Sequence, residues 1–507
     1  MNTAFENICA TFATFADAPG LAYRDDFEDI RFQDLHHRAL CLASRLREDV
    51  PAGARVAIFG HKSATYLVAY WACALTGHPV VPIELDMPIA RQQQIVENLN
   101  ISMAIDARRP LENQRFGDPS ILCDVSETKH APADLADLSP VDGEQIFYIL
   151  NSSGSTGAPK AICVTWDNVW DFVKWTDMLL PEAQKKYAIT GNVRYCFDVS
   201  LFEMWTSWRN LRPIISYSQA GMLNTRKLVE MFAQNTIGIW VGTPSIARIM
   251  CLDRTFCAIK LPTLQTFLFC GEQLDKSLVQ DLWTRFGSSI RIVNTYGPTE
   301  ATVAVTSVDI AACHVTDGLP LPIGVPREGT SLFGIPFAED SENMELVIAG
   351  RSVTAGYADP RQDKKAAFRT PGEYRTGDLV TQHANSNWYY QGRTDTECKI
   401  NGHRIDLRTL EDYVRSMSGV SEVKFERHAS KRGRVWLEAH VVIANTDATL
   451  SCFVEQLDAY FPPYFIPRVW HGYRELIVNL NSKIDWAKIK ALPENEKEKL
   501  IWTSAHS

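Results

Sequence analysis

The chain has 507 residues, of which 46% are hydrophobic and 22% are charged, and its formal net charge is -9. This composition is that of an ordinary globular protein, and the length predicts two or more domains rather than one core. The negative charge argues against nucleic acid or an anionic membrane surface as a partner, and no apolar stretch is long enough to span a bilayer.

The first part of the chain alternates short apolar runs with stretches of helical spacing. The predicted strands are 54–60, 78–84, 264–271 and 290–297, and the predicted helices are 62–77, 90–100 and 275–287. Strands that alternate with helices predict βαβ units, and therefore an α/β fold with parallel sheets covered by helices on both faces.

The pattern changes after about residue 345, where hairpins follow one another. The predicted hairpin segments are 345–350, 379–393 and 396–406, and the last of them turns on Asn401 and Gly402. A helix, two strands and a second helix follow, which is typical of a small α+β unit. We therefore predict a large N-terminal domain, 1–393, and a small mobile C-terminal domain, 394–507.

The twelve cysteines are scattered, with no CxxC pair and no Cys/His cluster at metal-ligand spacing. This pattern predicts reduced, mostly buried thiols. The N-terminus also lacks the basic start and the apolar centre of a signal peptide. The expected location is therefore the cytoplasm.

The segment NSSGSTGAPK (151–160) directly follows the apolar run IFYIL (146–150). A loop rich in Gly after a strand presents backbone N–H groups to phosphate oxygens, and its hydroxyls and lysine add further donors. The loop is neither a Walker loop nor a GxGxxG motif. By composition alone, a plain flexible connector is an equally good interpretation.

Other segments decide between these interpretations. In chain order they are GHPVVPIELD (77–86), RYCFDVSLFEM (194–204), FCGEQL (269–274), TYGPTE (295–300), VIAGRSVTAGYADP (347–360), YRTGDL (374–379), GRTD (392–395), KINGHRID (399–406) and NLNSKID (479–485). With the loop, this ordered set resembles the adenylate-forming enzymes, which include acyl-CoA synthetases, luciferases and the adenylation domains of nonribosomal peptide synthesis. The resemblance runs nearly end to end and implies ATP and Mg²⁺ as cofactors.

The resemblance also implies roles for individual residues. The phosphate-binding loop would act through Ser152, Ser153, Gly154, Ser155, Thr156, Gly157 and Lys160. The other implied nucleotide contacts are Gly271, Glu272, Asn294, Thr295, Tyr296, Gly297, Thr299, Asp378 and Arg393. Asp378 would bind the ribose hydroxyls, and Tyr296 would stack on adenine unless it is a plain core aromatic residue.

Three charged residues would carry the chemistry. Lys483 would lie between the substrate carboxylate and ATP, and Glu300 would hold Mg²⁺. Lys399 would face the thiol acceptor after the small domain has turned about a hinge at Asp395. Ser482 and Trp486 depart from the glycine and arginine that are usual beside this lysine, which puts the rate in doubt rather than the reaction type.

The segment FDVS (197–200) bears on the substrate. In amino-acid-activating members the aspartate of this motif pairs with the substrate ammonium group, so Asp198 marks an amino-acid pocket; the alternative is an N-cap for the following helix. The implied pocket wall is Val199, Phe202, Val241, Leu268, Cys270, Thr295, Val303 and Ala304. This wall carries no charge, and the motifs around it most resemble the members that load D-alanine onto a carrier protein.

The sequence therefore predicts an AMP-forming ligase. It would activate a small apolar amino acid, D-alanine or similar, and transfer it to the phosphopantetheine thiol of a separate carrier protein. Two alternatives stay open, an acyl-CoA synthetase of the same fold and a non-catalytic nucleotide-binding relative. The family's habit implies a monomer.

Overall fold

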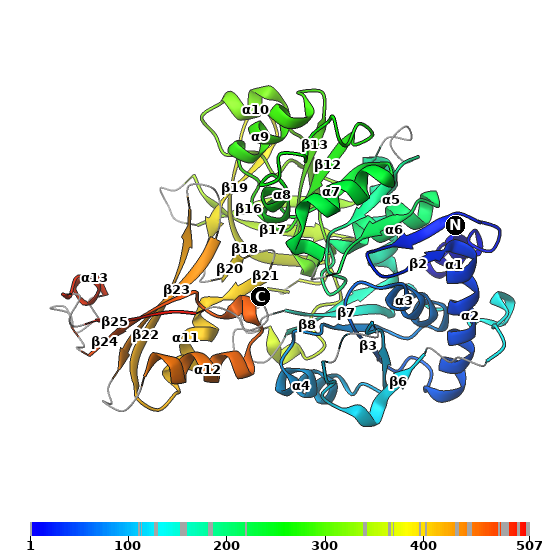
Figure 1. Ribbon diagram of the computed structural model, residues 1–507, viewed down its shortest axis with the longest axis horizontal. Helices are drawn as coiled ribbons and strands as arrows, with labels where there is room; N and C mark the ends of the chain where they lie inside the picture. Colours follow the sequence, from blue (N-terminus) through cyan, green and yellow to red (C-terminus); the bar gives the residue numbers. More distant parts are fainter. Residues whose placement is uncertain are drawn as a thin grey trace. The chain divides into compact units, whose positions relative to one another are not determined.

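In the computed structural model (Figure 1) the chain forms two compact units. The first comprises 1–85, 96–151 and 160–394, and the second comprises the remainder. The described residues are 3–109, 112, 114–125, 130–152, 160–180, 186–218, 221–337, 342–363, 367–368, 370–394, 397–400, 403–430, 435–443, 449–474, 477, 486–493 and 497–502. Asp395 lies outside them, so the hinge and the domain boundary stay predictions.

A six-stranded sheet of the first unit contains the loop's two flanking strands. In the order β6-β5-β3-β4-β7-β8 its strands are Leu122–Asp124, Met103–Asp106, Val56–Phe59, Val80–Ile83, Ile146–Ser152 and Lys160–Thr165. Helix α3 (Ala64–Thr76) connects β3 to its parallel neighbour β4 and ends at Gly77, whose φ of 70° suits a residue without a Cβ. This βαβ unit was predicted from the sequence.

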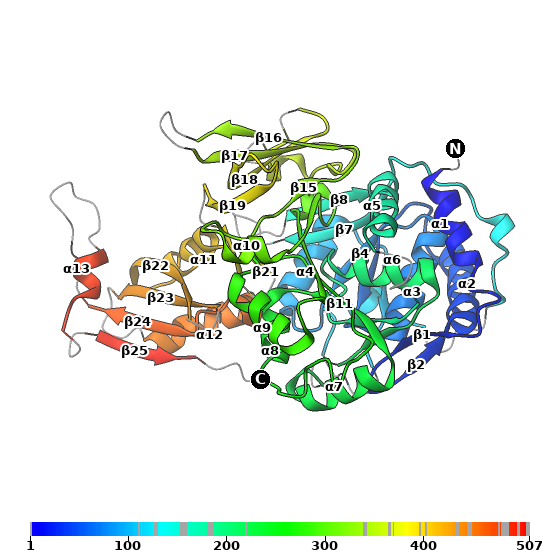
Figure 2. The ribbon, with the colours of Figure 1, turned by 90° about the horizontal axis from the view of Figure 1, so that it is seen from above.

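A nine-stranded sheet lies beside it in the first unit (Figure 2). In the order β15-β14-β13-β12-β11-β9-β10-β1-β2 its strands are Val325–Pro326, Thr306–Asp309, Arg291–Tyr296, Thr266–Phe269, Ile237–Gly242, Ala188–Gly191, Ile214–Ser216, Leu21–Arg24 and Asp29–Arg31. The strands from β13 to β1 are parallel, but β14, β15 and β2 are antiparallel at the two edges. The predicted parallel sheet is therefore a mixed one.

Helices cover both faces of this sheet, as predicted. On β12, Leu268 belongs to the core that also contains Phe202 of α6 (Ser200–Asn210), whereas Phe267 and Phe269 belong to a second core with Leu278 of α9 (Lys276–Phe286). Side chains of a strand alternate between its two faces, so this division is the expected one.

The remaining elements of residues 1–394 complete the helical layers and add an antiparallel sheet. The other helices are α1 (Ala4–Ala13), α2 (Phe32–Asp49), α4 (Ile89–Leu99), α5 (Trp166–Leu179), α7 (Thr225–Gln234), α8 (Pro244–Met250) and α10 (Ala312–Thr316). The antiparallel sheet consists of β16 (Thr330–Pro336), β17 (Met344–Gly350), β18 (Glu373–Gln382) and β19 (Trp388–Arg393). Its last hairpin was predicted from the sequence.

The second unit contains the α+β arrangement predicted for the C-terminal part. A ribbon of β20 (Glu397–Ile400) and β21 (His403–Asp406) precedes the four-stranded sheet β22 (Val420–Ala429), β23 (Val435–Ile443), β24 (Val469–Tyr473) and β25 (Lys497–Ile501). The helices are α11 (Leu407–Arg415), α12 (Leu450–Tyr460) and α13 (Trp486–Lys490). Helices α11 and α12 pack on one face of the sheet, while Ile489 of α13 packs against Val442 and Tyr473 on the other.

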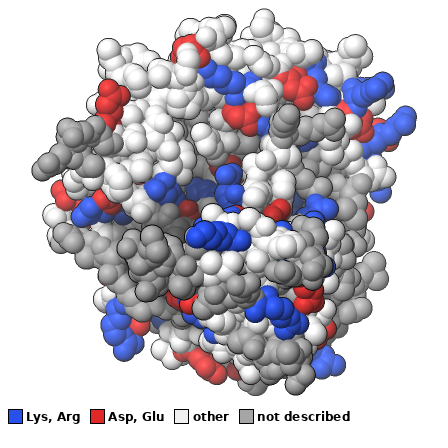
Figure 3. Space-filling view, turned by 90° about the vertical axis from the view of Figure 1, so that its left-hand side faces the viewer, with Lys and Arg blue, Asp and Glu red and all other residues white. Residues whose placement is uncertain are grey.

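Surface and thiol chemistry agree with the composition. Among the described residues on the face in Figure 3, basic and acidic side chains are interspersed. All twelve cysteines are free thiols, and within the described parts of the chain no helix could cross a membrane.

Candidate active site

Four neighbouring parallel strands of the nine-stranded sheet end together and place the predicted site residues at one edge. Strands β9, β11, β12 and β13 are paired in parallel, and Leu268 of β12 lies in register between Val241 of β11 and Val293 of β13. The carboxyl ends of parallel strands are where α/β sheets bind ligands. The segments after these strands contain most of the residues that the motifs single out.

The predicted substrate wall is part of the core of the first unit. Its members Val199, Phe202, Val241, Leu268, Cys270, Val303 and Ala304 all lie in a single buried core cluster, and Thr295 is buried beside them on β13. The Cys270 sulfur lies 3.8 Å from the backbone oxygen of Val303. Strand alternation therefore brings the predicted wall residues of β11 and β12 to the same face as those of α6 and of the 302–304 segment.

Asp198, which precedes Val199 of the predicted wall in the chain, is buried with 8% of its area exposed. Helix α6 begins after it, but the N-cap position is Val199 and that cap has no side-chain hydrogen bond. Val199, and not Asp198, therefore occupies the N-cap position of α6. Burial raises the pKa of the Tyr148 hydroxyl well above its usual range, and the nearby Asp198 carboxylate raises it further. The carboxylate thus exerts its charge within a buried environment.

The 302–304 segment is held in an unusual backbone conformation. Thr302 and Val303 have φ values of 56° and 68°, a region that β-branched residues rarely adopt. The Ala304 N–H donates to the Thr302 carbonyl oxygen at 2.8 Å, which closes a tight turn around Val303. Such strain costs about 1–3 kcal/mol per residue and gathers at functional sites. Gly297 packs against this turn, because a Cβ at that position would lie 2.5 Å from the Ala304 Cα.

Replacement of Gly297 by alanine is expected to destabilise the protein by about 1–3 kcal/mol, the usual effect of overpacking, because the obstructing atom is backbone and cannot turn away. The change should also displace Val303 and Ala304 and weaken substrate use. Thermal unfolding of the variant would measure the first effect. Gly318→Ala is the matched control, since a Cβ there meets nothing within 4 Å. Equal unfolding temperatures for both variants would contradict this expectation.

A second cluster lies after β13 and contains the predicted ribose contacts. The Tyr296 hydroxyl donates to one oxygen of Asp378, and Arg393 Nη1 lies 2.5 Å from the other. Asp378 and Arg393 face each other across the β18–β19 hairpin, and their side chains are 10% and 14% exposed. Burial raises the pKa of Tyr296, and the charge of Asp378 raises it further. One carboxylate therefore joins two of the predicted nucleotide-binding side chains.

Three other predicted nucleotide contacts form hydrogen bonds within the protein. Asn294 Nδ2 donates to the Pro322 carbonyl oxygen at 2.8 Å, and the Thr295 hydroxyl donates to that of Phe269 at 2.8 Å. Glu272 accepts hydrogen bonds from the backbone N–H and the hydroxyl of Ser245, in the first turn of α8. These bonds fix the loops that follow β11, β12 and β13.

Gly271 lies between β12 and these loops with a φ of 91°. A Cβ there would approach the methyl groups of Thr243 and Val199 to 3.4 and 3.7 Å. These are ordinary van der Waals distances, so the positive φ, and not a lack of space, is the reason that glycine suits this position.

The predicted magnesium ligand, Glu300, is 1% exposed within the 3₁₀ turn Thr299–Ala301. Its Oε1 accepts a hydrogen bond of 3.1 Å from the Tyr357 hydroxyl, and Lys160 Nζ lies 5.5 Å from the centre of the Tyr357 ring. No group of three or more metal-ligating side chains occurs among the described residues. One carboxylate fits Mg²⁺ nevertheless, because this ion is usually held by one or two carboxylates together with substrate phosphates.

Several predicted residues are not brought into these clusters. Lys399 is exposed on β20, in the second unit. Residues outside the described parts of the chain are Ser153, Gly154, Ser155, Thr156, Gly157 and Lys483, and the side chain of Ser152 is likewise not described. The assignments of these residues stay predictions.

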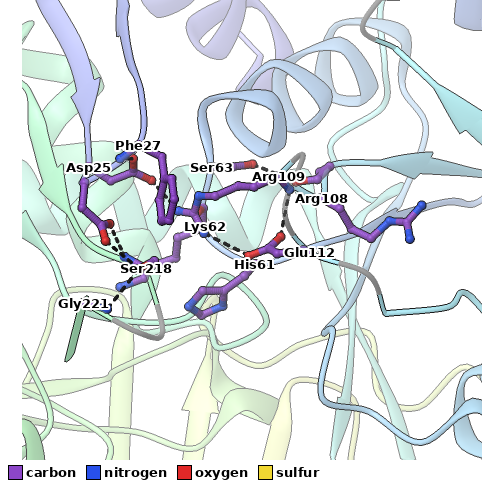
Figure 4. Close-up of polar contacts among 12 residues, drawn as sticks. Asp25, Phe27, His61, Lys62, Ser63, Arg108, Arg109, Glu112, Ser218 and Gly221 are labelled. Atoms are coloured by element: carbon purple, nitrogen blue, oxygen red, sulfur yellow. Dashed lines mark hydrogen bonds and ion pairs between the residues drawn. The ribbon is translucent and has the colours of Figure 1, made fainter. Parts of the chain in front are cut away.

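A buried ionic network lies behind the substrate wall, and the sequence did not predict it. Figure 4 shows Arg109 in contact with Asp25 and with the backbone oxygen of Lys62. Lys62 Nζ donates to the carbonyl oxygen of Gly191 at 2.6 Å, where β9 ends, and burial lowers its pKa to about 8. The partners are 129 positions apart in the chain, so no local motif marks them.

Asn192, whose backbone oxygen accepts from Lys62 Nζ at 3.4 Å, connects this network to the predicted substrate wall. The side chain of Asn192 donates to the carbonyl oxygen of Val241 at 2.6 Å, and its backbone N–H donates to Glu203 at 2.7 Å. Glu203 belongs to α6, which also carries Phe202 of the wall. The buried polar groups therefore fix β9, β11 and α6 relative to one another.

Comparison with known proteins shows the family to which the chain belongs. The AMP-binding enzyme family matches residues 10–358. A D-alanine--D-alanyl carrier protein ligase from Listeria welshimeri is 30% identical over 480 residues, which cover 90% of this chain and 92% of the relative. A ligase of the same name from Bacillus licheniformis is 29% identical over 488 residues, which cover 93% and 96%.

A solved structure has the same fold. The adenylation domain AlmE from Vibrio cholerae, in complex with glycyl-adenosine-5'-phosphate, matches with a TM-score of 0.80 at 21% identity, and the match covers 97% of each chain. The predicted α/β fold and the resemblance drawn from the motifs are thus confirmed. The chain belongs to the AMP-binding enzyme family.

Proposed function

We propose that the protein uses ATP to activate a small apolar amino acid, D-alanine or similar, and transfers it to the phosphopantetheine thiol of a separate carrier protein. The observation that carries this proposal is the buried carboxylate of Asp198 next to Val199, one of the uncharged residues of the predicted pocket wall. The ammonium group of an amino acid is a cation that can pair with this buried carboxylate. The names of the two curated relatives support both the amino acid and the carrier.

In the first half-reaction the substrate carboxylate attacks the α-phosphorus of ATP, the bond to the β-phosphate oxygen breaks, and pyrophosphate leaves. Such phosphoryl chemistry depends on positioning and on cationic charge. Asp198 would orient the ammonium group and Asp378 the ribose, while Lys160 and Lys483 would contribute positive charge. Glu300 would hold Mg²⁺, which neutralises phosphate charge when bound.

In the second half-reaction the carrier thiol attacks the carbonyl carbon of the aminoacyl-AMP. The thiol loses its proton, a thioester forms, and AMP leaves. Lys399 on β20 would face this thiol after the small domain has turned at Asp395. We also propose that the protein acts as a monomer in the cytoplasm, without insertion into membranes.

Amino-acid-dependent ATP–pyrophosphate exchange tests the proposal. The panel would contain D- and L-alanine, serine, valine, proline and threonine, together with fatty and aryl acids. We expect exchange with one small apolar amino acid, D-alanine above all. Exchange only with acids that lack an amino group would indicate an acyl-CoA synthetase. Exchange with none of them, combined with tight ATP binding, would indicate the non-catalytic relative.

A further inference from the structure

The short segment 354–358 links the strand that follows the phosphate-binding loop to the predicted magnesium ligand. Its backbone is hydrogen-bonded to β8 on one side, since the Cys163 N–H donates to Gly356 and the Ala358 N–H donates to Ala161, each at 2.8 Å. On the other side the Thr354 N–H donates to the backbone oxygen of Glu300 at 3.0 Å. The segment is therefore anchored to both parts of the nucleotide site.

The side chain of Tyr357 makes a second connection, between the charged groups of Glu300 and Lys160. Its hydroxyl donates to Glu300 Oε1 at 3.1 Å, and its ring lies 5.5 Å from Lys160 Nζ, within the range of a cation–π interaction. The ring of Phe368 packs against the Tyr357 ring in a T-shaped arrangement, with the two ring centres 5.4 Å apart. Tyr357 is 9% exposed and Lys160 is 7% exposed, so these contacts are made in a largely desolvated environment where polar interactions are strong.

We propose that Tyr357 is a positioning residue that sets the Glu300 carboxylate and the Lys160 ammonium group for Mg²⁺ and the ATP phosphates. A hydroxyl bound to Oε1 limits the rotation of the carboxylate and would keep Glu300 in one orientation when it holds Mg²⁺. The ring face attracts the ammonium group and would hold Lys160 in place for its contact with a phosphate. This inference rests on the proposed function only in naming ATP and Mg²⁺ as the ligands.

Tyr357→Phe tests the hydroxyl alone, because the ring and its contact with Lys160 are retained. Calorimetric titration of ATP at a series of Mg²⁺ concentrations measures binding without any need for catalysis. We expect the Mg²⁺ concentration for half-maximal enhancement of ATP affinity to rise about tenfold, the effect of one lost hydrogen bond to a charged group. In pyrophosphate exchange, the KM for the amino acid should be unchanged.

Tyr389→Phe is the matched control. Tyr389 is fully buried on β19 and accepts one hydrogen bond, from Asn385 at 2.8 Å. Loss of the Tyr389 hydroxyl should leave the Mg²⁺ dependence of ATP affinity unchanged. Thermal unfolding of both variants shows whether the fold is kept. The same Mg²⁺ dependence in Tyr357→Phe and the wild type would overturn the inference.

Failure of the proposed function has a different signature. A wild-type protein that binds ATP with Mg²⁺ but exchanges no pyrophosphate would contradict the proposed reaction, while the calorimetric comparison would still decide the role of Tyr357. Absence of Mg²⁺-dependent ATP binding in the wild type would overturn both.

Discussion

Replacement of Asp198 by alanine is expected to reduce amino-acid-dependent pyrophosphate exchange by about 10²–10³-fold. Removal of one partner from a buried charge pair costs about 3–5 kcal/mol, and 1.4 kcal/mol corresponds to a factor of ten. The loss should appear chiefly as a raised KM for the amino acid, because the carboxylate would bind the ammonium group before and during the reaction. Initial rates of exchange at varied amino acid concentration measure it.

The control for this change is Asp177→Ala, which removes a carboxylate whose partner is Arg209 at 3.0 Å. Exchange by that variant should equal exchange by the wild type. ATP affinity should stay unchanged in Asp198→Ala, since the ribose and phosphate contacts are made by other residues. An unaltered KM for the amino acid in Asp198→Ala would show that the substrate ammonium group is not bound at this carboxylate.

Replacement of Asp378 by alanine should raise the KM for ATP by about 100-fold. The ribose hydroxyls would lose their acceptor, and the carboxylate that holds both Tyr296 and Arg393 would be lost at the same time. The loss of this ion pair should also lower the free energy of unfolding by about 3 kcal/mol. Exchange kinetics at varied ATP and denaturant unfolding measure the two effects.

Asp378→Asn separates these two contributions, because an amide oxygen can still accept one hydrogen bond although the charge is gone. Its KM for ATP should fall between those of the wild type and the alanine variant. The KM for the amino acid should be the same in all three proteins. An equal rise in the KM for ATP and in the KM for the amino acid would mean that Asp378 acts through the stability of the first unit and not through contact with the nucleotide.

Most of the βαβ framework could be predicted from local sequence. The predicted strand at 54–60 contains β3, the predicted helix at 62–77 contains α3, and Gly77 ends that helix. Hydrophobic periodicity and a glycine stop are local signals, so one sequence is enough to locate such elements. The antiparallel edges of the nine-stranded sheet were not predicted, because β2 and β14, which pair with the preceding strands β1 and β13, are not among the predicted strands.

The site was only partly predictable for the same reason. Asp378, Arg393 and Glu300 belong to motifs, so a resemblance can single them out. The connection of Lys62 to the end of β9 depends on pairing across 129 residues. The positive φ of Val303 runs against the local preference of a β-branched residue, and only the surrounding fold imposes it. Tyr357 belongs to a motif, but its contacts with Glu300 and Lys160 are visible only in three dimensions.

The alternation along β12 has a consequence for how substrate choice can change. Leu268 belongs to the predicted pocket wall, while its neighbours Phe267 and Phe269 pack in a separate core on the opposite face of the same strand. Mutations that reshape the pocket can therefore accumulate at every second position without disturbing the packing of the other layer. A mutational library confined to the wall-facing positions of β11 and β12 would sample new acids while it preserves the scaffold, so the two properties can evolve separately.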